Sequence, residues 1–130
     1  MVGPGFTISV LSGWTVRKTA KTVVAASGPE LVSVTRFPLV KRYEPAKFAA
    51  VSQELDRIAD QLAARGGGAV TKRQTVTVDG GKIRAYRFTA KGTAANRIGF
   101  VLVGKTEYQL ICSGRIGAGC ELLFSSFSSA

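Results

Sequence analysis

Histidine is absent from this chain of 130 residues, and cysteine occurs only twice. Many serine and cysteine hydrolases use a histidine base, and neither a Ser-His-Asp nor a Cys-His arrangement can form here. The commonest metal ligand is missing too, and two cysteines alone are too few for a tetrahedral zinc site. We therefore predict a protein that is not an enzyme and that holds no metal and no cofactor.

Long apolar runs are also lacking, since no stretch approaches the ~20 residues of a transmembrane helix. No secretory leader is visible, because Met1–Gly5 leads directly into the strand-like run Phe6–Val10. A Met1 that replaces a removed leader and a genuine cytosolic start would look identical. With 45% hydrophobic and 20% charged residues, the composition is that of a single globular domain spanning residues 1–130.

Acidic residues are scarce: there are 18 Lys and Arg against 8 Asp and Glu, a formal net charge of +10. Bases dominate between residues 72 and 97, whereas residues 44 to 65 are near neutral. The candidate anion-binding residues are Lys72, Arg73, Lys82, Arg84, Arg87, Lys91 and Arg97. Such a surface attracts nucleic acid or other polyanions through a salt-sensitive field. Alternatively, bases at solvent-facing strand positions maintain solubility and block edge-to-edge pairing.

The first forty residues predict antiparallel strands. Phe6–Val10 alternates apolar and polar residues, and a turn at Ser12–Gly13 leads into Trp14–Arg17, which indicates a first hairpin. Two further runs, Thr22–Ala26 and Glu30–Phe37, flank a glycine-proline turn.

One long helix is predicted at about residues 45–65, because Pro45 suits a first helical position and Gly66–Gly68 suits a helix end. Its apolar stripe consists of Phe48, Val51, Leu55, Ile58, Ala59 and Leu62. Asp79-Gly80-Gly81 then predicts a hairpin between Val70–Val78 and Lys82–Thr89. Ile98–Val103 is expected to be a central strand covered on both faces, and a short helix is expected at about residues 118–127.

Tyr86 and Phe88 share a strand face with Lys82 and Arg84. Aromatic side chains among bases are typical of single-stranded nucleic-acid binders, but we expect these two rings to lie in the core. Asp56 and Asp60, one helical turn apart, form a conceivable carboxylate pair. Basic neighbours on a solvated helix face would not drive their pKa values apart as acid–base catalysis requires.

Cys112 and Cys120 are too far apart in sequence for the redox motif CxxC. A disulfide between them would fasten a strand end to a helix start and would indicate an oxidising compartment. The alternative is a pair of buried free thiols that pack as small hydrophobic side chains.

The pattern Phe6-x-Ile8-x-Val10-x-x-Gly13-Trp14, followed by a single long helix, a hairpin, Tyr108-x-Leu110-x-Cys112 and Cys120-x-x-x-Phe124-x-x-Phe127, resembles the PsbP-like family. The likeness is to small secreted proteins or lipoproteins of actinobacteria. It implies an α/β/α sandwich with a central antiparallel sheet, in a protein that is secreted or anchored at the cell surface. Whether a lipid anchor precedes Met1 stays open.

PsbP-like domains are known mainly as non-enzymatic binding or assembly modules, and the metal-associated histidines of photosynthetic members have no counterpart here. We therefore expect an exported cell-envelope module that contacts an acidic protein partner through a basic sheet or hairpin surface. The alternative function is polyanion binding by the seven bases. A hydrolase would require a pocket that holds a carboxylate with a perturbed pKa.

Overall fold

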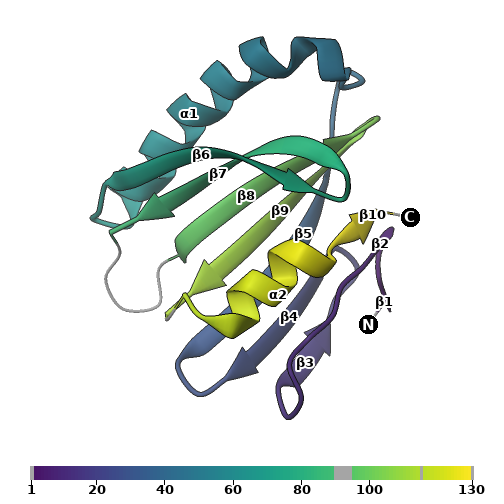
Figure 1. Ribbon diagram of the computed structural model, residues 1–130, viewed down its shortest axis with the longest axis vertical. Coiled ribbons are helices and arrows are strands. Elements are labelled where there is room, and N and C mark those ends of the chain that lie inside the picture. Colours follow the sequence, from purple (N-terminus) through teal and green to yellow (C-terminus); the bar gives the residue numbers. More distant parts are fainter. Residues whose placement is uncertain (1, 90–94, 115, 130) are drawn as a thin grey trace.

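The computed structural model describes residues 2–89, 95–114 and 116–129, except for the side chain of Ala95. Seven antiparallel strands form the main sheet in the order β3-β4-β5-β9-β8-β7-β6, and β1, β2 and β10 form a small second sheet (Figure 1). Two helices complete an α+β fold, one long and one short and C-terminal, as predicted. The elements are β1 (Val2–Gly3), β2 (Phe6–Thr7), β3 (Thr15–Lys18), β4 (Thr22–Ser27), β5 (Glu30–Pro38), α1 (Phe48–Arg65), β6 (Val70–Val78), β7 (Gly81–Phe88), β8 (Ala95–Val103), β9 (Thr106–Ser113), α2 (Ala118–Ser126) and β10 (Ser128–Ser129).

The two helices cover opposite faces of the main sheet. Successive residues of a strand point to opposite faces, and the buried side chains divide into two clusters that follow this alternation. Val34 and Leu110 pack with α2 on one face, while Tyr86 and Phe100 pack with α1 on the other. Neither helix, within the part of the chain that the structure describes, has the length and hydropathy needed to cross a bilayer.

The long helix begins and ends close to the predicted bounds. A 3₁₀ turn at Pro45–Lys47 leads directly into α1, which begins at Phe48. The buried residues of α1 are Leu55, Ala59 and Ala63. At its end the N–H groups of Gly67 and Gly68 donate to Ala64 O and Ala63 O, at 3.1 and 2.9 Å. With a φ of 74° at Gly67, this is a Schellman cap, which glycine adopts without strain.

The predicted hairpin joins β6 to β7. Its loop is Asp79-Gly80, and both residues have positive φ angles, 54° and 75°, as a type I′ turn requires. Tyr86 and Phe88 are only 1% and 8% exposed. Their expected core position is therefore confirmed, and these rings are not available to stack on nucleic-acid bases.

Strand β8 lies between β7 and β9, as expected for a central strand. Phe100 joins the cluster beneath α1 and Val101 joins the cluster beneath α2. Val103, at the strand end, is 42% exposed. The predicted burial of both strand faces therefore does not extend to Val103, the last residue of Ile98–Val103.

The predicted first hairpin is wrong. β2 pairs with β1 and β10, so the N-terminal segment meets the C-terminal end of the chain, and β3 pairs with β4 instead. Phe6 explains the difference, since it is 1% exposed and its ring centroid lies 5.7 Å from those of Tyr108 and Phe127. These aromatic contacts outweigh the local turn signal at Ser12–Gly13.

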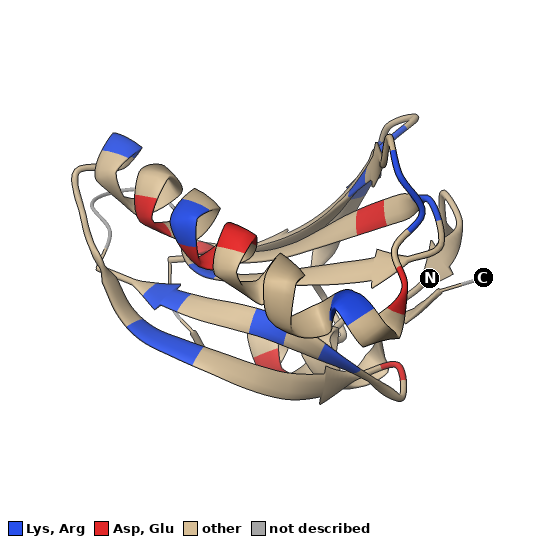
Figure 2. Cartoon of the chain, turned by 90° about the horizontal axis from the view of Figure 1, so that it is seen from above, with Lys and Arg blue, Asp and Glu red and all other residues tan. Residues whose placement is uncertain are grey.

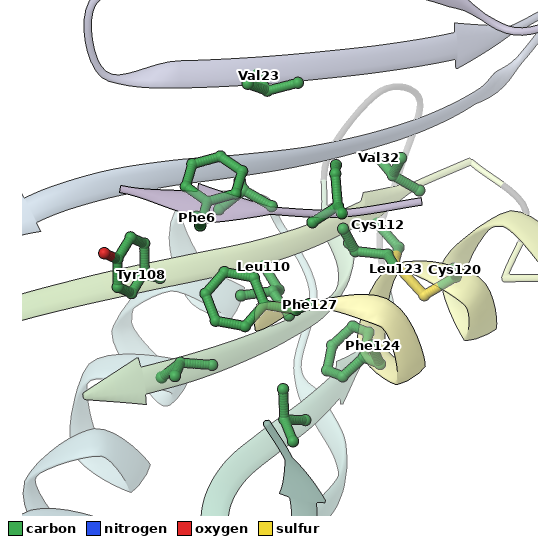
Figure 3. Packing of buried hydrophobic residues seen from close by; sticks show 14 of the residues in the cluster. Phe6, Val23, Val32, Tyr108, Leu110, Cys112, Cys120, Leu123, Phe124 and Phe127 are labelled. Carbon is green, nitrogen blue, oxygen red and sulfur yellow. A yellow bond between two sulfur atoms is a disulfide. The ribbon is translucent and has the colours of Figure 1, made fainter. Parts of the chain in front are cut away.

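The core beneath α2 surrounds the two cysteines (Figure 3). The Sγ atoms of Cys112 and Cys120 lie 2.08 Å apart, at disulfide-bonding distance, and connect β9 to the start of α2. Trp14 packs on the same helix end: a Cβ on Gly119 would lie 2.5 Å from Trp14 Cη2. The start of α2 is thus fixed by a covalent bond and by an indole ring that requires glycine beneath it.

Candidate functional site

The seven candidate anion-binding residues do not form one surface. Strand register places Arg73, Lys82 and Arg84 on the face that α1 covers, and Lys72, Arg87 and Arg97 on the face that α2 covers. Lys91 lies outside the described residues. The structure therefore divides the predicted basic stretch between the two sides of the sheet.

Three of the seven bases form ion pairs with acidic side chains. Arg73, Arg84 and Arg97 form ion pairs with Asp60, Asp56 and Glu121 at 2.6, 2.9 and 3.2 Å. Arg97 is only 6% exposed, and its guanidinium carbon lies 4.0 Å from the ring centroid of Phe124. Burial lowers the pKa of Arg97, although Glu121 opposes this effect. These arginines connect structural elements and have little charge left for a polyanion.

A polar network holds α1 against β7. Asp56 Oδ1 accepts hydrogen bonds from Tyr86 Oη at 2.5 Å and from Arg84 Nη2 at 2.9 Å. Burial acts to raise the pKa of Asp56, but the hydrogen bonds from Tyr86 and Arg84 outweigh it and hold the pKa below its usual value. Burial and then Asp56 raise the pKa of Tyr86. Because Asp60 pairs with Arg73 instead, the two carboxylates serve as separate anchors for α1.

We expect Asp56→Asn to make the free energy of unfolding fall less steeply as the pH is lowered into the acid range. A carboxylate with a depressed pKa in the folded state contributes stability that is complete above its unfolded pKa, about 3.9, and is lost as pH falls through the folded pKa. Urea unfolding at several pH values between about 5 and 2 should therefore show a shallower decline for the variant. The control is Glu44→Gln in the exposed segment before α1, and parallel declines for Asp56→Asn and the wild type would contradict the role of Asp56.

A second group of bases, which sequence reasoning missed, gathers at one end of the main sheet. Lys21, Arg36 and Lys105 line a hollow of about 380 Å³. Backbone hydrogen bonds hold their segments together: Arg36 N–H donates to Lys21 O at 2.9 Å, and Leu39 N–H donates to Lys105 O at 2.8 Å. We define the basic end as Lys21, Arg36, Lys41, Arg42 and Lys105.

The basic end is exposed, and none of its members forms an ion pair with a carboxylate of the described residues. Blue segments from separate strands and loops gather at the end of the sheet that lies on the side of the two chain termini (Figure 2). The five bases come from three regions of the chain that meet because β5 pairs with β4 on one side and with β9 on the other. Charge density along the sequence could not reveal these bases, because they are far apart in the chain. Only knowledge of which strands pair would have brought them together.

An apolar groove adjoins the basic end. It has a volume of about 300 Å³ and lies between α1, strands β8 and β9, and the segment that links β5 to α1. Its aliphatic side chains are Leu39, Val51, Leu55, Ile58 and Leu102, and its polar rim consists of Lys41, Arg42, Tyr43, Lys47, Glu54 and Glu107. We call this feature the α1 groove, and it shares Lys41 and Arg42 with the basic end.

The groove stays open because α1 packs on only part of its face of the sheet. The helix packs on β6 and β7, where the small side chains of Ala59 and Ala63 allow close approach. In the view from above, the strands fan out and α1 follows one side of the fan (Figure 2). Val51 and Ile58 consequently remain only partly buried.

Neither the protein-family models nor the curated proteins include a match to this chain. Within residues 2–89, 95–114 and 116–129, no group of three or more His, Cys, Asp or Glu side chains is placed to hold a metal ion. The geometry offers charge and apolar surface: five exposed bases beside a groove lined by aliphatic side chains.

Proposed function

We propose that this protein is a non-enzymatic, PsbP-like binding module of the cell envelope that contacts an acidic protein partner through the basic end. The observation that carries the proposal is the gathering of five exposed bases from three regions of the chain, outside ion pairs with the described carboxylates. A surface of one sign steers a partner of the opposite sign and fixes its orientation.

The arrangement of the helices and the cysteine pair supports the remaining parts of the proposal. One helix on each face of an antiparallel sheet is the layering that the PsbP-like resemblance implies. The Cys112–Cys120 pair at bonding distance suits a protein that folds in an oxidising compartment. We take both features as reasons to place the protein outside the cytoplasm.

Polyanion binding is the alternative function, and the hollow between Lys21, Arg36 and Lys105 favours it. Three cationic side chains around one concavity suit a phosphate or sulfate group as well as a carboxylate. A nucleic acid or acidic polysaccharide held in this way would dissociate steeply as salt is raised.

Fluorescence anisotropy at physiological salt tests both functions. We expect the variant Lys21→Gln/Arg36→Gln/Lys105→Gln to bind labelled polyglutamate about tenfold more weakly than the wild type, because the central cations of the site are lost. The matched control is Arg65→Gln/Lys72→Gln/Lys82→Gln, which removes the same charge from exposed positions elsewhere and should bind like the wild type.

Equal losses in the two variants would contradict the proposal, since binding would then follow net charge alone. Single-stranded DNA and heparin are titrated in parallel. If either binds more tightly than polyglutamate and depends on the basic end, polyanion binding replaces the protein-partner function.

A further inference from the structure

The α1 groove has an aliphatic interior that this chain does not fill. Leu39, Val51, Ile58 and Leu102 line it while remaining only partly buried, and Leu55 forms part of its base. Its volume of about 300 Å³ is at the lower end of the range of roughly 300–1,000 Å³ typical of ligand pockets. The apolar part of a ligand for this groove is therefore small.

The rim of the groove carries unbalanced positive charge. Of its two acids, Glu54 pairs with Arg57, whereas Glu107 accepts a hydrogen bond from the neutral amide of Gln109 at 2.9 Å and keeps its charge. Among the described residues, three rim bases therefore stand against one unpaired rim carboxylate. The three rim bases, Lys41, Arg42 and Lys47, make no ion pair with a described carboxylate. An anionic group at the mouth of the groove would meet cations whose charge is not otherwise satisfied within the described part of the chain.

We propose that the α1 groove binds a medium-chain anionic amphiphile. The alkyl chain lies beneath α1 against Leu55, Ile58 and Leu102, and the carboxylate or other anionic head lies at the mouth. Burial of methylene groups drives binding, and the charge at the mouth selects anionic over neutral amphiphiles. The part of this site that binds the alkyl chain is separate from the surface proposed for the acidic protein, although the two share Lys41 and Arg42 at the mouth.

The groove is preformed, because its helical wall is anchored from the opposite side. Asp56 and Asp60 fasten α1 to Arg84 and Arg73 on β7 and β6. The helix therefore does not need to close over a ligand or to move away from the sheet to admit one. A preformed pocket avoids the ordering cost that weakens binding to mobile surfaces.

Displacement of a fluorescent fatty acid tests the site. Dansylamino-undecanoic acid is titrated into the intact wild-type protein, and decanoate and decanol then compete for the probe. We expect saturable one-to-one binding, with decanoate competing about tenfold more strongly than decanol because only the carboxylate meets the rim cations. No saturable binding, or equal competition by the two compounds, would overturn the proposal.

Two pairs of variants locate the ligand. Val51→Trp should abolish probe binding by filling the groove, whereas Ala50→Trp, which adds the same ring at an exposed position of α1, should not. Lys41→Gln/Lys47→Gln should weaken decanoate about tenfold and leave decanol unchanged, whereas Lys72→Gln/Lys82→Gln should change neither. Wild-type affinity in Val51→Trp, or equal effects of the two lysine pairs, would refute the site.

The outcome is independent of the acidic-partner proposal. Polyglutamate is titrated into Val51→Trp in the same series, and its binding should be unaffected. Loss of amphiphile binding with retained polyglutamate binding would show that the groove and the basic end act separately. Failure of the wild type to bind the amphiphile would remove the groove proposal alone.

Discussion

Replacement of Phe6 by alanine is expected to lower the free energy of unfolding by about 3–5 kcal/mol, the usual cost of removing a large aromatic side chain from a core. Phe6 is 1% exposed and contacts the rings of Tyr108 and Phe127. Gly3 closes over it from β1: a Cβ there would lie 2.2 Å from Phe6 Cζ. Because the cavity would be enclosed by β1 and the core, the surroundings could collapse only partly.

Urea denaturation followed by circular dichroism measures this loss. The neighbouring exposed residue supplies the control, since Thr7→Ala should change stability by less than about 0.5 kcal/mol. If the two substitutions have similar small effects, β2 does not dock between β1 and β10 as described.

Removal of the disulfide in the double variant Cys112→Ala/Cys120→Ala is expected to cost about 2–4 kcal/mol. The bond ties β9 to the start of α2, and both cysteines are almost fully buried, at 0% and 2% exposed. For the same reason, a mild reductant should cleave it in the wild type only after the fold opens. Urea denaturation with and without reductant measures both effects, and a double variant as stable as the oxidised wild type would contradict them.

Thiol trapping in the producing cell extends this experiment to the compartment. If the protein is exported, lysis and unfolding of the cells in the presence of a maleimide reagent should find neither Cys112 nor Cys120 free. Two modified thiols on the mature protein would contradict the proposed export. That result would not bear on the proposals for the basic end and the α1 groove.

The sequence predicted those elements that local patterns determine. The apolar stripe of α1, its glycine cap and the Asp79-Gly80 turn each act within a few residues, and the structure has all three near the expected positions. The N-terminal hairpin was predicted from equally local signals and is wrong, because the burial of Phe6 against Tyr108 depends on contacts between distant parts of the chain.

The candidate site was harder to predict for the same reason. The bases between residues 72 and 97 are close in sequence, yet strand alternation sends them to opposite faces. Lys21, Arg36 and Lys105 are distant in sequence, yet the pairing of β5 with both β4 and β9 brings them to one hollow. Charge along a sequence locates a charged surface only when one strand face or one helix face carries it.

The pairing of β5 with β9 also determines when the chain can fold. Residues 31 to 38 pair with residues 106 to 113 in the middle of the sheet, so the strands made first on the ribosome lack their central neighbour until most of the chain has been synthesised. Such long-range pairing is slow to form. The sheet of a nascent chain with this topology cannot be completed until β9 has been made; if the protein is exported as proposed, a translocation channel can engage it before the core closes.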